Sequence, residues 1–559
     1  MAERTSRALP LLDGRLEHVF PTLTAAQIAR IAPHGKLRRV EPGELLTRAG
    51  ETNVPFFVVT AGELEIVRPS GATEQLVTVH GPGMFTGEAN MLSGRRSFVL
   101  MRATKPGEVI ELTRDQLLEL VQTDSELGEI LMRAFILRRT ELIAHNFGDV
   151  VLIGSAHSAG TLRIKEFLTR NGHPYSYVDL DRDPATQQML DQFHIDVTDI
   201  PVLICRGTSV LRNPSNQRIA ECLGFNESID QTQLRDVIVV GAGPAGLAAA
   251  VYAASEGLDV LVIESDSPGG QAASSSKIEN YLGFPMGVSG QELAARAYNQ
   301  AQKFGAQLMI ATGAQKLACH TKPYAVDVGN GSQISARTVV IATGAEYRRL
   351  PLPNLSQFEG AGVYYGATFI ESQLCRDEEV IVVGGGNSAG QAVVFLAQTA
   401  KLVYMLVRSD GLADSMSRYL IRRIEQTPNI ILRTQTEITA LDGGDQLEHV
   451  TCRHIPTGKV ETHDIRHVFV MTGAVPCTGW LSGCLALDAG GFVKTGNDLS
   501  KEDLTAAGWP LARNPYLLET TLPGVFAVGD VRGGNVKRVA SAVGEGSIAI
   551  SFVHKTLHE

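Results

Sequence analysis

The stretch RDVIVVGAGPAGLAAAVYAASEGLDVLVIE, residues 235–264, decides the fold of the larger part of this chain. A short β-branched run leads through Gly241, Gly243 and Gly246 into an alanine-rich segment, and a second apolar run ends at Glu264. This order predicts a strand, a glycine-rich turn, a helix and a parallel strand. Such glycines let the backbone approach a diphosphate at the helix N-terminus, and the acid is placed to accept hydrogen bonds from a ribose. The stretch therefore predicts a dinucleotide site in a Rossmann-like domain.

A second stretch, EEVIVVGGGNSAGQAVVFLAQTAKLVYMLVR at residues 378–408, repeats the same design. Arg408 stands where Glu264 ends the first unit, and an arginine there favours the 2′-phosphate of NADPH over NADH. Asp410 lies close by, which leaves NADH open. The candidate contacts of this second loop are Gly384, Gly386, Asn387, Ser388 and Arg408.

Composition limits the function classes. The chain has 559 residues, a net charge of −10 and no dense block of Lys and Arg, so neither nucleic acid nor a membrane surface is the expected partner. Without an apolar run of about 18 residues or the apolar core of a signal peptide, we expect no membrane span and a cytoplasmic location. The seven cysteines are scattered without a C-x-x-C, which predicts mostly buried thiols, no disulfide framework and no metal site.

The first 230 residues differ in pattern from the rest. Short β-branched strands between about residues 35 and 112 predict a β-barrel or jelly roll, and a helical stretch near residues 126–143 either packs on it or pairs with a second subunit. Residues 149 to about 225 alternate strand, helix and strand, as in a small α/β unit.

Residues 235–559 resemble low-molecular-weight thioredoxin reductases. Besides both loops, the flavin-side segments of that family occur in order, namely PGGQAASSSKIENYLGFP (268–285), IATGA (341–345) and PGVFAVGDVR (523–532). The resemblance implies FAD, NADPH or NADH, and a homodimer. The residues that it implies as FAD contacts are Gly241, Gly243, Gly246, Glu264, Gly270, Gln271, Asn280, Thr343, Gly344, Gly529, Asp530 and Val539.

The expected fold class is α/β, with two Rossmann-like three-layer dinucleotide-binding domains preceded by a β-barrel or jelly-roll domain and a small thioredoxin-fold domain. We place the barrel with its C-terminal helix at 1–145 and the small domain at 146–230. The FAD-binding domain takes 231–350 and 480–559, and the NAD(P)H-binding domain at 351–479 is inserted into it.

One motif of the resembled family is missing. Its members carry C-A-T-C-D where this chain has Gly366-Ala367-Thr368-Phe369-Ile370. Gly366 and Phe369 cannot form the dithiol that exchanges with a disulfide, so we expect no catalytic residue there. We predict hydride transfer from NAD(P)H to FAD and on to a non-disulfide acceptor such as a quinone, oxygen or a small redox protein. Two alternatives stay open: a disulfide reductase that uses other cysteines or a partner's thiols, and a nucleotide-regulated redox sensor.

The nicotinamide side also departs from the family. Its H-R-R cluster aligns with residues 407–409, where only Arg408 remains, so Arg418, Arg422 or Arg423 are candidates to compensate. Cys375, alone after the missing motif, is expected to be a core thiol.

The middle segment resembles a glutaredoxin whose C-x-x-C is replaced by residues 155–158, Ser-Ala-His-Ser. DIPVLI, residues 199–204, matches the glutaredoxin loop that carries a cis proline, which makes Pro201 a candidate cis proline. Serines cannot carry electrons as a disulfide does, so we expect this unit to dock or space other domains.

The N-terminal barrel resembles a cyclic-nucleotide-binding domain of the catabolite-activator kind. The candidate pocket is Gly87, Glu88, Arg96 and Ser97. The arginine that binds the cyclic phosphate in that family aligns with Ser97, one residue past Arg96. The barrel therefore either binds a cyclic nucleotide or serves without one. Since no helix-turn-helix follows, DNA binding is not expected.

Overall fold

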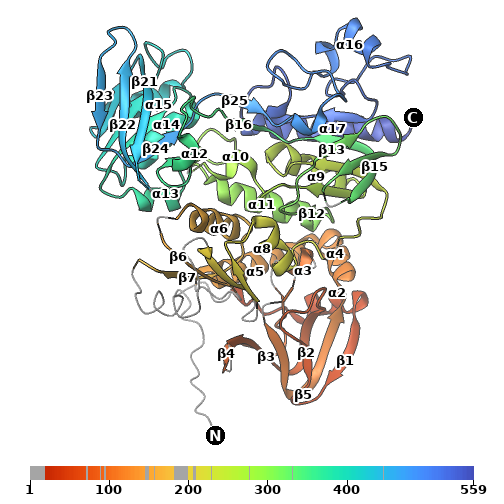
Figure 1. The fold of residues 1–559 in the computed structure, drawn as a ribbon. Helices are drawn as coiled ribbons and strands as arrows, with labels where there is room; N and C mark the ends of the chain where they lie inside the picture. Colours follow the sequence, from red (N-terminus) through yellow and green to blue (C-terminus); the bar gives the residue numbers. More distant parts are fainter. Residues whose placement is uncertain are drawn as a thin grey trace.

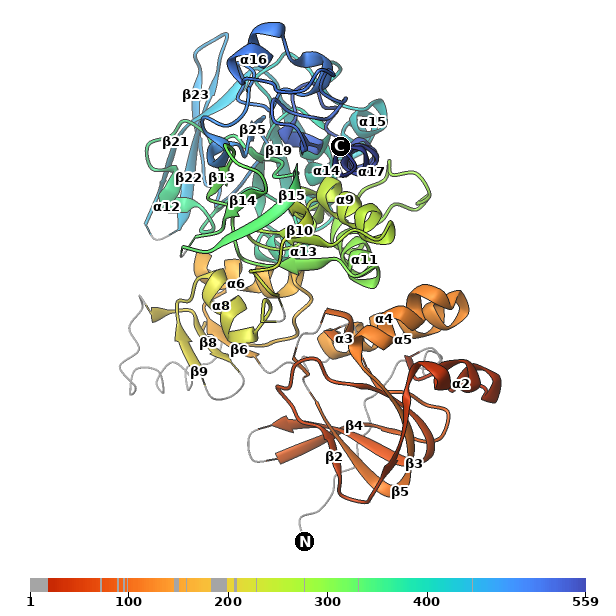
Figure 2. The ribbon, with the colours of Figure 1, turned by 90° about the vertical axis from the view of Figure 1, so that its right-hand side faces the viewer.

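The computed structural model describes residues 19–559 except 71–72, 88–89, 94–95, 98, 145–149, 157, 182–198, 206–208, 228, 276, 330 and 445. Along the chain come a β-rich N-terminal domain, a small middle unit and two α/β domains (Figure 1). The middle unit and the N-terminal domain lie beside each other on the same side of the two α/β domains (Figures 1 and 2).

The N-terminal domain is an antiparallel sheet in the order β1-β5-β3-β4, with β2 on β5. Its helix α5 carries Leu127, Leu131, Ala134 and Phe135 into the core of the sheet, so α5 packs on its own domain. The elements are α2 (Ala25–Ile31), η1 (Ala32–His34), β1 (Lys36–Val40), β2 (Leu45–Thr47), β3 (Phe56–Ser70), β4 (Thr73–His80), α3 (Asn90–Ser93), β5 (Leu100–Leu112), α4 (Arg114–Thr123) and α5 (Ser125–Ala144).

The middle unit has a four-stranded sheet in the order β7-β6-β8-β9, with β6 parallel to β7 and antiparallel to β8. The Ile200–Pro201 peptide is cis, as the sequence predicted. The elements are β6 (Val150–Gly154), α6 (Ala159–Arg170), β7 (Ser176–Asp179), β8 (Val202–Cys205), β9 (Ser209–Arg212) and α8 (Asn216–Leu223).

The first α/β domain has a seven-stranded sheet in the order β12-β11-β10-β15-β14-β13, with β26 on β15. Its central strand β10 is almost wholly buried because helices α9 and α17 cover it. The elements are β10 (Arg235–Val240), α9 (Pro244–Ser255), β11 (Val260–Ile263), α10 (Gly270–Ala273), α11 (Gly290–Lys303), β12 (Gln307–Met309), β13 (Lys316–Ala318), β14 (Tyr324–Asp327), β15 (Gln333–Ile341), η3 (Gly479–Leu481), η4 (Gly496–Asp498), α16 (Lys501–Ala506), β26 (Val525–Ala527), η5 (Gly529–Val531) and α17 (Val539–Leu557).

The second α/β domain is inserted into the first, and the chain crosses between them on the antiparallel pair β16 (Ala345–Tyr347) and β25 (Ala474–Pro476). Its parallel sheet runs β17-β24-β18-β19-β20, and a separate β21-β22-β23 sheet accompanies it. The elements are α12 (Leu355–Phe358), β17 (Val363–Tyr364), α13 (Phe369–Leu374), β18 (Glu379–Val383), α14 (Asn387–Leu396), β19 (Leu402–Leu406), α15 (Arg418–Gln426), β20 (Ile430–Arg433), β21 (Thr436–Gly443), β22 (Leu447–His454), β23 (Val460–His463) and β24 (His467–Val470).

The expectation that the cysteines are mostly buried thiols was wrong for four of the seven. Cys205 is disulfide-bonded to Cys222 across β8 and α8, and Cys319 is bonded to Cys484. The partners are 17 and 165 residues apart in sequence, and only the tertiary fold brings them together. No local spacing could have revealed these pairs.

The N-terminal domain also contacts the first α/β domain, where α3 and α4 lie against α11. The Gln122 side chain donates to the Lys303 carbonyl at 3.0 Å. Among the described residues, no helix has both the length and the apolar composition that crossing a bilayer requires.

Candidate functional site

One large cavity, about 730 Å³, lies where the two α/β domains face each other. Its wall contains most of the residues that the sequence predicted as FAD contacts. They are Gly241, Gly243, Glu264, Gly270, Gln271, Asn280, Thr343, Gly344, Gly529, Asp530 and Val539.

The first glycine-rich loop has the geometry that a diphosphate needs. Gly241 has a φ of +104°, and a Cβ added at Gly246 would lie 1.8 Å from the Gly241 carbonyl oxygen. A Cβ added at Gly243 would lie 3.9 Å from the nearest atom, the Gly270 Cα. Two glycines are therefore required by the turn, whereas Gly243 keeps the surface open for a ligand at the N-terminus of α9.

Glu264 is buried at the end of β11 and fastens the loop. Its two carboxylate oxygens accept hydrogen bonds from the Ala242 amide at 2.7 Å and the Asp266 amide at 2.9 Å. Burial raises the pKa of Glu264, and these amides oppose the rise. The predicted contact with a ribose remains a prediction, and the structure adds a role in shaping the loop.

The flavin-side segments form the cavity wall next to the first loop. The Gln271 amide donates to the Ala345 carbonyl at 2.5 Å, and the Thr343 hydroxyl donates to the Cys477 carbonyl at 2.8 Å. Burial raises the pKa of Asp530, while the charge of Lys537 lowers it. These contacts keep the crossing strands β16 and β25 against the cavity.

The second loop reaches the same cavity. Asn387 and Ser388, at the start of α14, line it, and the Tyr347 hydroxyl hydrogen-bonds to the Ser388 side chain from the crossing strand. Both predicted dinucleotide sites thus open into one space. Gly384, Gly386 and Arg408 are not part of the lining that the described residues form, and Arg408 is exposed beyond β19. Arg423, a candidate to compensate, instead pairs with Glu279 at 2.7 Å.

The position of the missing dithiol also borders the cavity. Gly366 lines it beside Ser274, and Ala367 forms a β-bridge with Ser275. Cys375 is fully buried, and burial raises the pKa of its thiol to about 12, so it is the core thiol that the sequence predicted. Sequence reasoning missed Cys477, the one cysteine among the described lining residues. Burial raises its pKa to about 11.

The comparison with known proteins agrees with this geometry. Residues 235–546 match the family of pyridine nucleotide-disulphide oxidoreductases. The chain belongs to this family. Thioredoxin reductases of Treponema pallidum and Bacillus subtilis are each 32% identical to this oxidoreductase, over 56% and 59% of this chain and 94% and 97% of theirs.

Solved structures agree. The Lactococcus lactis thioredoxin reductase in its FR conformation aligns with a TM-score of 0.51 at 25% identity, over 58% of this chain and 99% of its own. The thioredoxin reductase of T. acidophilum has the same TM-score at 27% identity, over 59% and 100%. Residues 37–124 match the cyclic nucleotide-binding domain, which confirms the interpretation of the barrel.

Unlike the matched region, the middle unit is an addition to this oxidoreductase, and its helix α6 forms part of the cavity wall. Leu162, Glu166 and Arg170 line the cavity. At its first turn, Ala159 is so close to Gly360 of the second α/β domain that a Cβ there would lie 2.7 Å from the Ala159 Cβ. Sequence reasoning missed these residues, because no motif marks a helix that contacts another domain.

A carboxyl pair joins α6 to the helix that follows the missing dithiol. Glu166 hydrogen-bonds to Glu371, and burial together with this contact raises the pKa of Glu166 to about 9. Glu371 is buried and accepts hydrogen bonds from the Thr368 amide at 2.7 Å and from the Thr368 hydroxyl. The raised pKa of Glu166 means that Glu166 carries a proton at neutral pH and can donate it to Glu371.

The predicted nucleotide pocket of the barrel is described only in part, since Glu88 lies outside the described residues. Ser97 is buried, and its hydroxyl donates to the Val99 carbonyl at 2.8 Å. The Arg96 guanidinium forms an ion pair with Glu227, between the middle unit and β10, with Nε 3.0 Å from the carboxylate.

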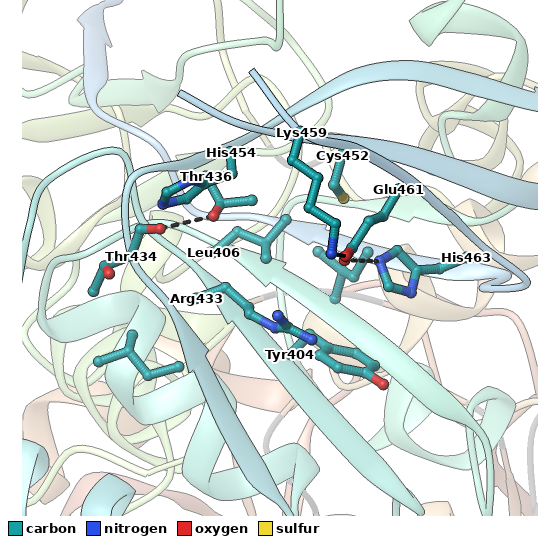
Figure 3. Close-up of a pocket in the computed structure, with 12 residues that line it drawn as sticks. Tyr404, Leu406, Arg433, Thr434, Thr436, Cys452, His454, Lys459, Glu461 and His463 are labelled. Carbon is teal, nitrogen blue, oxygen red and sulfur yellow. Dashed lines mark hydrogen bonds and ion pairs between the residues drawn. The ribbon is translucent and has the colours of Figure 1, made fainter. Parts of the chain in front are cut away.

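A second pocket of about 280 Å³ lies between β19–β20 and the β21-β22-β23 sheet (Figure 3). The Arg433 guanidinium lies 5.9 Å from the centre of the Tyr404 ring, and Lys459 pairs with Glu461 on the opposite wall. None of the residues predicted from the sequence lines this pocket. Among the described residues, no cluster of His, Cys, Asp and Glu could hold a metal.

Proposed function

We propose that this oxidoreductase transfers hydride from NADPH to FAD and passes the electrons to an acceptor that is not a protein disulfide. The observation that carries the proposal is the site of the missing dithiol, where Gly366 and Phe369 replace the cysteines. Helix α6 borders the same place through Glu166, which hydrogen-bonds to Glu371. A protein disulfide that docked at the missing dithiol site would find no thiol for exchange, and helix α6 would obstruct its approach.

The cavity fits the cofactors. Gly243 leaves room at the N-terminus of α9, and Asn387 and Ser388 present the start of α14 to the same space. When bound, FAD would accept hydride from the nicotinamide and supply the redox chemistry. The residues of the chain need only align the two rings and exclude water.

An anaerobic titration with NADPH tests the proposal. The measurement is the number of NADPH equivalents that fully reduce the bound flavin. We expect about one equivalent per FAD, since flavin is then the only centre that NADPH reduces. The same titration of the C205S/C222S and C319S/C484S variants is the control, and it should also give about one.

About two equivalents in the native chain, falling to about one in either variant, would restore the disulfide-reductase alternative. A flavin that stays oxidised with both NADPH and NADH would refute the proposal as a whole.

The cofactor choice and the assembly state belong to the proposal too. Arg408 is exposed next to the second loop, where a 2′-phosphate would meet it, and this favours NADPH over NADH. A homodimer and a cytoplasmic location are the expectations that the thioredoxin reductase resemblance adds.

A second candidate function is regulation by a cyclic nucleotide. The match to the cyclic nucleotide-binding domain and the ion pair of Arg96 with Glu227 favour it, because a bound phosphate would compete with Glu227 for the guanidinium. Calorimetry with cyclic AMP and cyclic GMP tests it. No heat and no change in the rate of flavin reduction would exclude it.

A further inference from the structure

Arg170, the last residue of α6, lies at the first dinucleotide loop although it belongs to the middle unit. Its guanidinium donates to the Gly270 carbonyl at 3.0 Å and lies 3.4 Å from the Asp266 carboxylate. Gly270 packs directly on Gly243, since a Cβ added to Gly270 would lie 3.0 Å from the Gly243 Cα. Arg170 therefore stands between the loop that receives a diphosphate and the end of β11, where a ribose is expected.

One nitrogen of this guanidinium has no partner. The Nε of Arg170 is buried and forms no hydrogen bond with any described residue. A buried N–H without an acceptor is costly, and such groups in folded proteins usually have a partner in a ligand, an ion or water. The Nε itself has almost no accessible surface, but the Arg170 side chain is 23% exposed and lines the cavity, so phosphate or ribose oxygens of FAD would meet its terminal nitrogens.

The charge of Arg170 is only weakly compensated. Glu166, one turn earlier on α6, has its pKa raised to about 9 and is uncharged at neutral pH. Asp266 pairs with Arg170 at 3.4 Å, and the buried Glu264 also interacts with the charge of Arg170. The other cations of the lining are Lys537 and Arg538, which belong to the segment beside Asp530. Arg170 is thus the lining cation that bonds to Gly270, the residue packed on the first loop.

We propose that Arg170 is an FAD-binding residue, and that its guanidinium donates to the phosphate and ribose oxygens of the AMP half of FAD. The inference rests on the proposed function, since it takes FAD as the occupant of this cavity. It gives the middle unit, which has Ser-Ala-His-Ser at residues 155–158 in place of a C-x-x-C, a role in cofactor binding.

The test measures FAD affinity in the full-length chain. FAD is added to flavin-free protein and binding is followed by flavin fluorescence, with thermal stabilisation by FAD as a second readout. R170Q is expected to weaken FAD binding by roughly 10- to 100-fold, the range for loss of a charge-assisted hydrogen bond.

Two variants separate cofactor binding from structural roles. R218Q removes the same charge from the middle unit, but Arg218 is exposed and pairs with Glu221 on α8, so its FAD affinity should stay native. D266N removes the carboxylate that pairs with Arg170 but keeps the guanidinium. Its FAD affinity should stay within about threefold of the native value, which is under 1 kcal/mol.

An R170Q variant that binds FAD with native affinity would overturn this inference and leave the proposed function intact. Equal weakening in R170Q and D266N would show that Arg170 only holds the middle unit in place, and equal weakening in R218Q would show a general charge or folding effect. Either result would also overturn it. If the native chain fails to bind FAD, the proposed function fails with it.

Discussion

Replacing Glu166 by Gln should stabilise the chain above neutral pH. In the folded chain the pKa of Glu166 is raised from 4.5 to about 9, first by burial and then by its hydrogen bond to Glu371. A raised carboxyl pKa gives stability that is complete below about pH 4.5 and is lost as the pH rises toward 9. The native chain must therefore bind a proton at neutral pH to keep this contact.

The size of the effect follows from the shift. Neutral pH lies about 2.5 units above the unfolded value, and each unit is worth about 1.4 kcal/mol, which sets an upper limit near 3.5 kcal/mol. Glu166 is only partly buried, so about 1 to 3 kcal/mol is expected. The amide introduced by E166Q donates the same hydrogen bond to Glu371 without binding a proton.

The assay is thermal unfolding at pH 5.5, 7.0 and 8.5. At pH 8.5 the first transition of E166Q should lie a few degrees above that of the native chain, and the difference should shrink toward pH 5.5. E221Q is the matched control, because Glu221 is on the exposed face of α8 and pairs with Arg218 on the same helix. Parallel pH curves for E166Q and the native chain, or a less stable E166Q at pH 8.5, would refute the reasoning.

Three further predictions concern the glycines and the second loop. G246A should prevent folding of the FAD domain, while G243A should fold and lose FAD affinity, as stability and flavin content would show. R408S should raise the KM for NADPH several-fold and leave that for NADH unchanged in steady-state assays. G87A should destabilise the barrel by about 1 to 3 kcal/mol in denaturant unfolding, since Gly87 has a φ of +106° and an added Cβ would lie 2.4 Å from the Met91 sulfur.

The sequence predicted those parts of the site that depend on local backbone patterns. Short runs of glycines and strand residues specify the first loop, the flavin-side segments and the second loop, because each run fits one local backbone structure. The structure brings these parts to one cavity. The missing dithiol was equally visible, because a substitution of cysteine is read directly from residues 366–370.

The parts that the sequence did not predict depend on contacts between distant segments. Arg170 and Glu166 lie on an ordinary amphipathic helix, and only its packing on two other domains brings them to the cavity. Cys319 and Cys484 meet through the tertiary fold. The ion pair of Arg96 with Glu227 was also not predictable, because the two residues lie far apart in the sequence.

The position of α6 has a consequence for the encounter with free partner proteins. Because the middle unit is covalently tethered beside the lost dithiol position, its local concentration there is on the order of millimolar. A free protein at about one micromolar would compete at a thousandfold disadvantage, or about 4 kcal/mol, for equal contacts. The tethered middle unit therefore competes with free proteins for the surface beside the missing dithiol site. Under the proposed function, electron acceptors small enough to enter beside α6 would keep their access, while macromolecules would first have to displace the tethered unit.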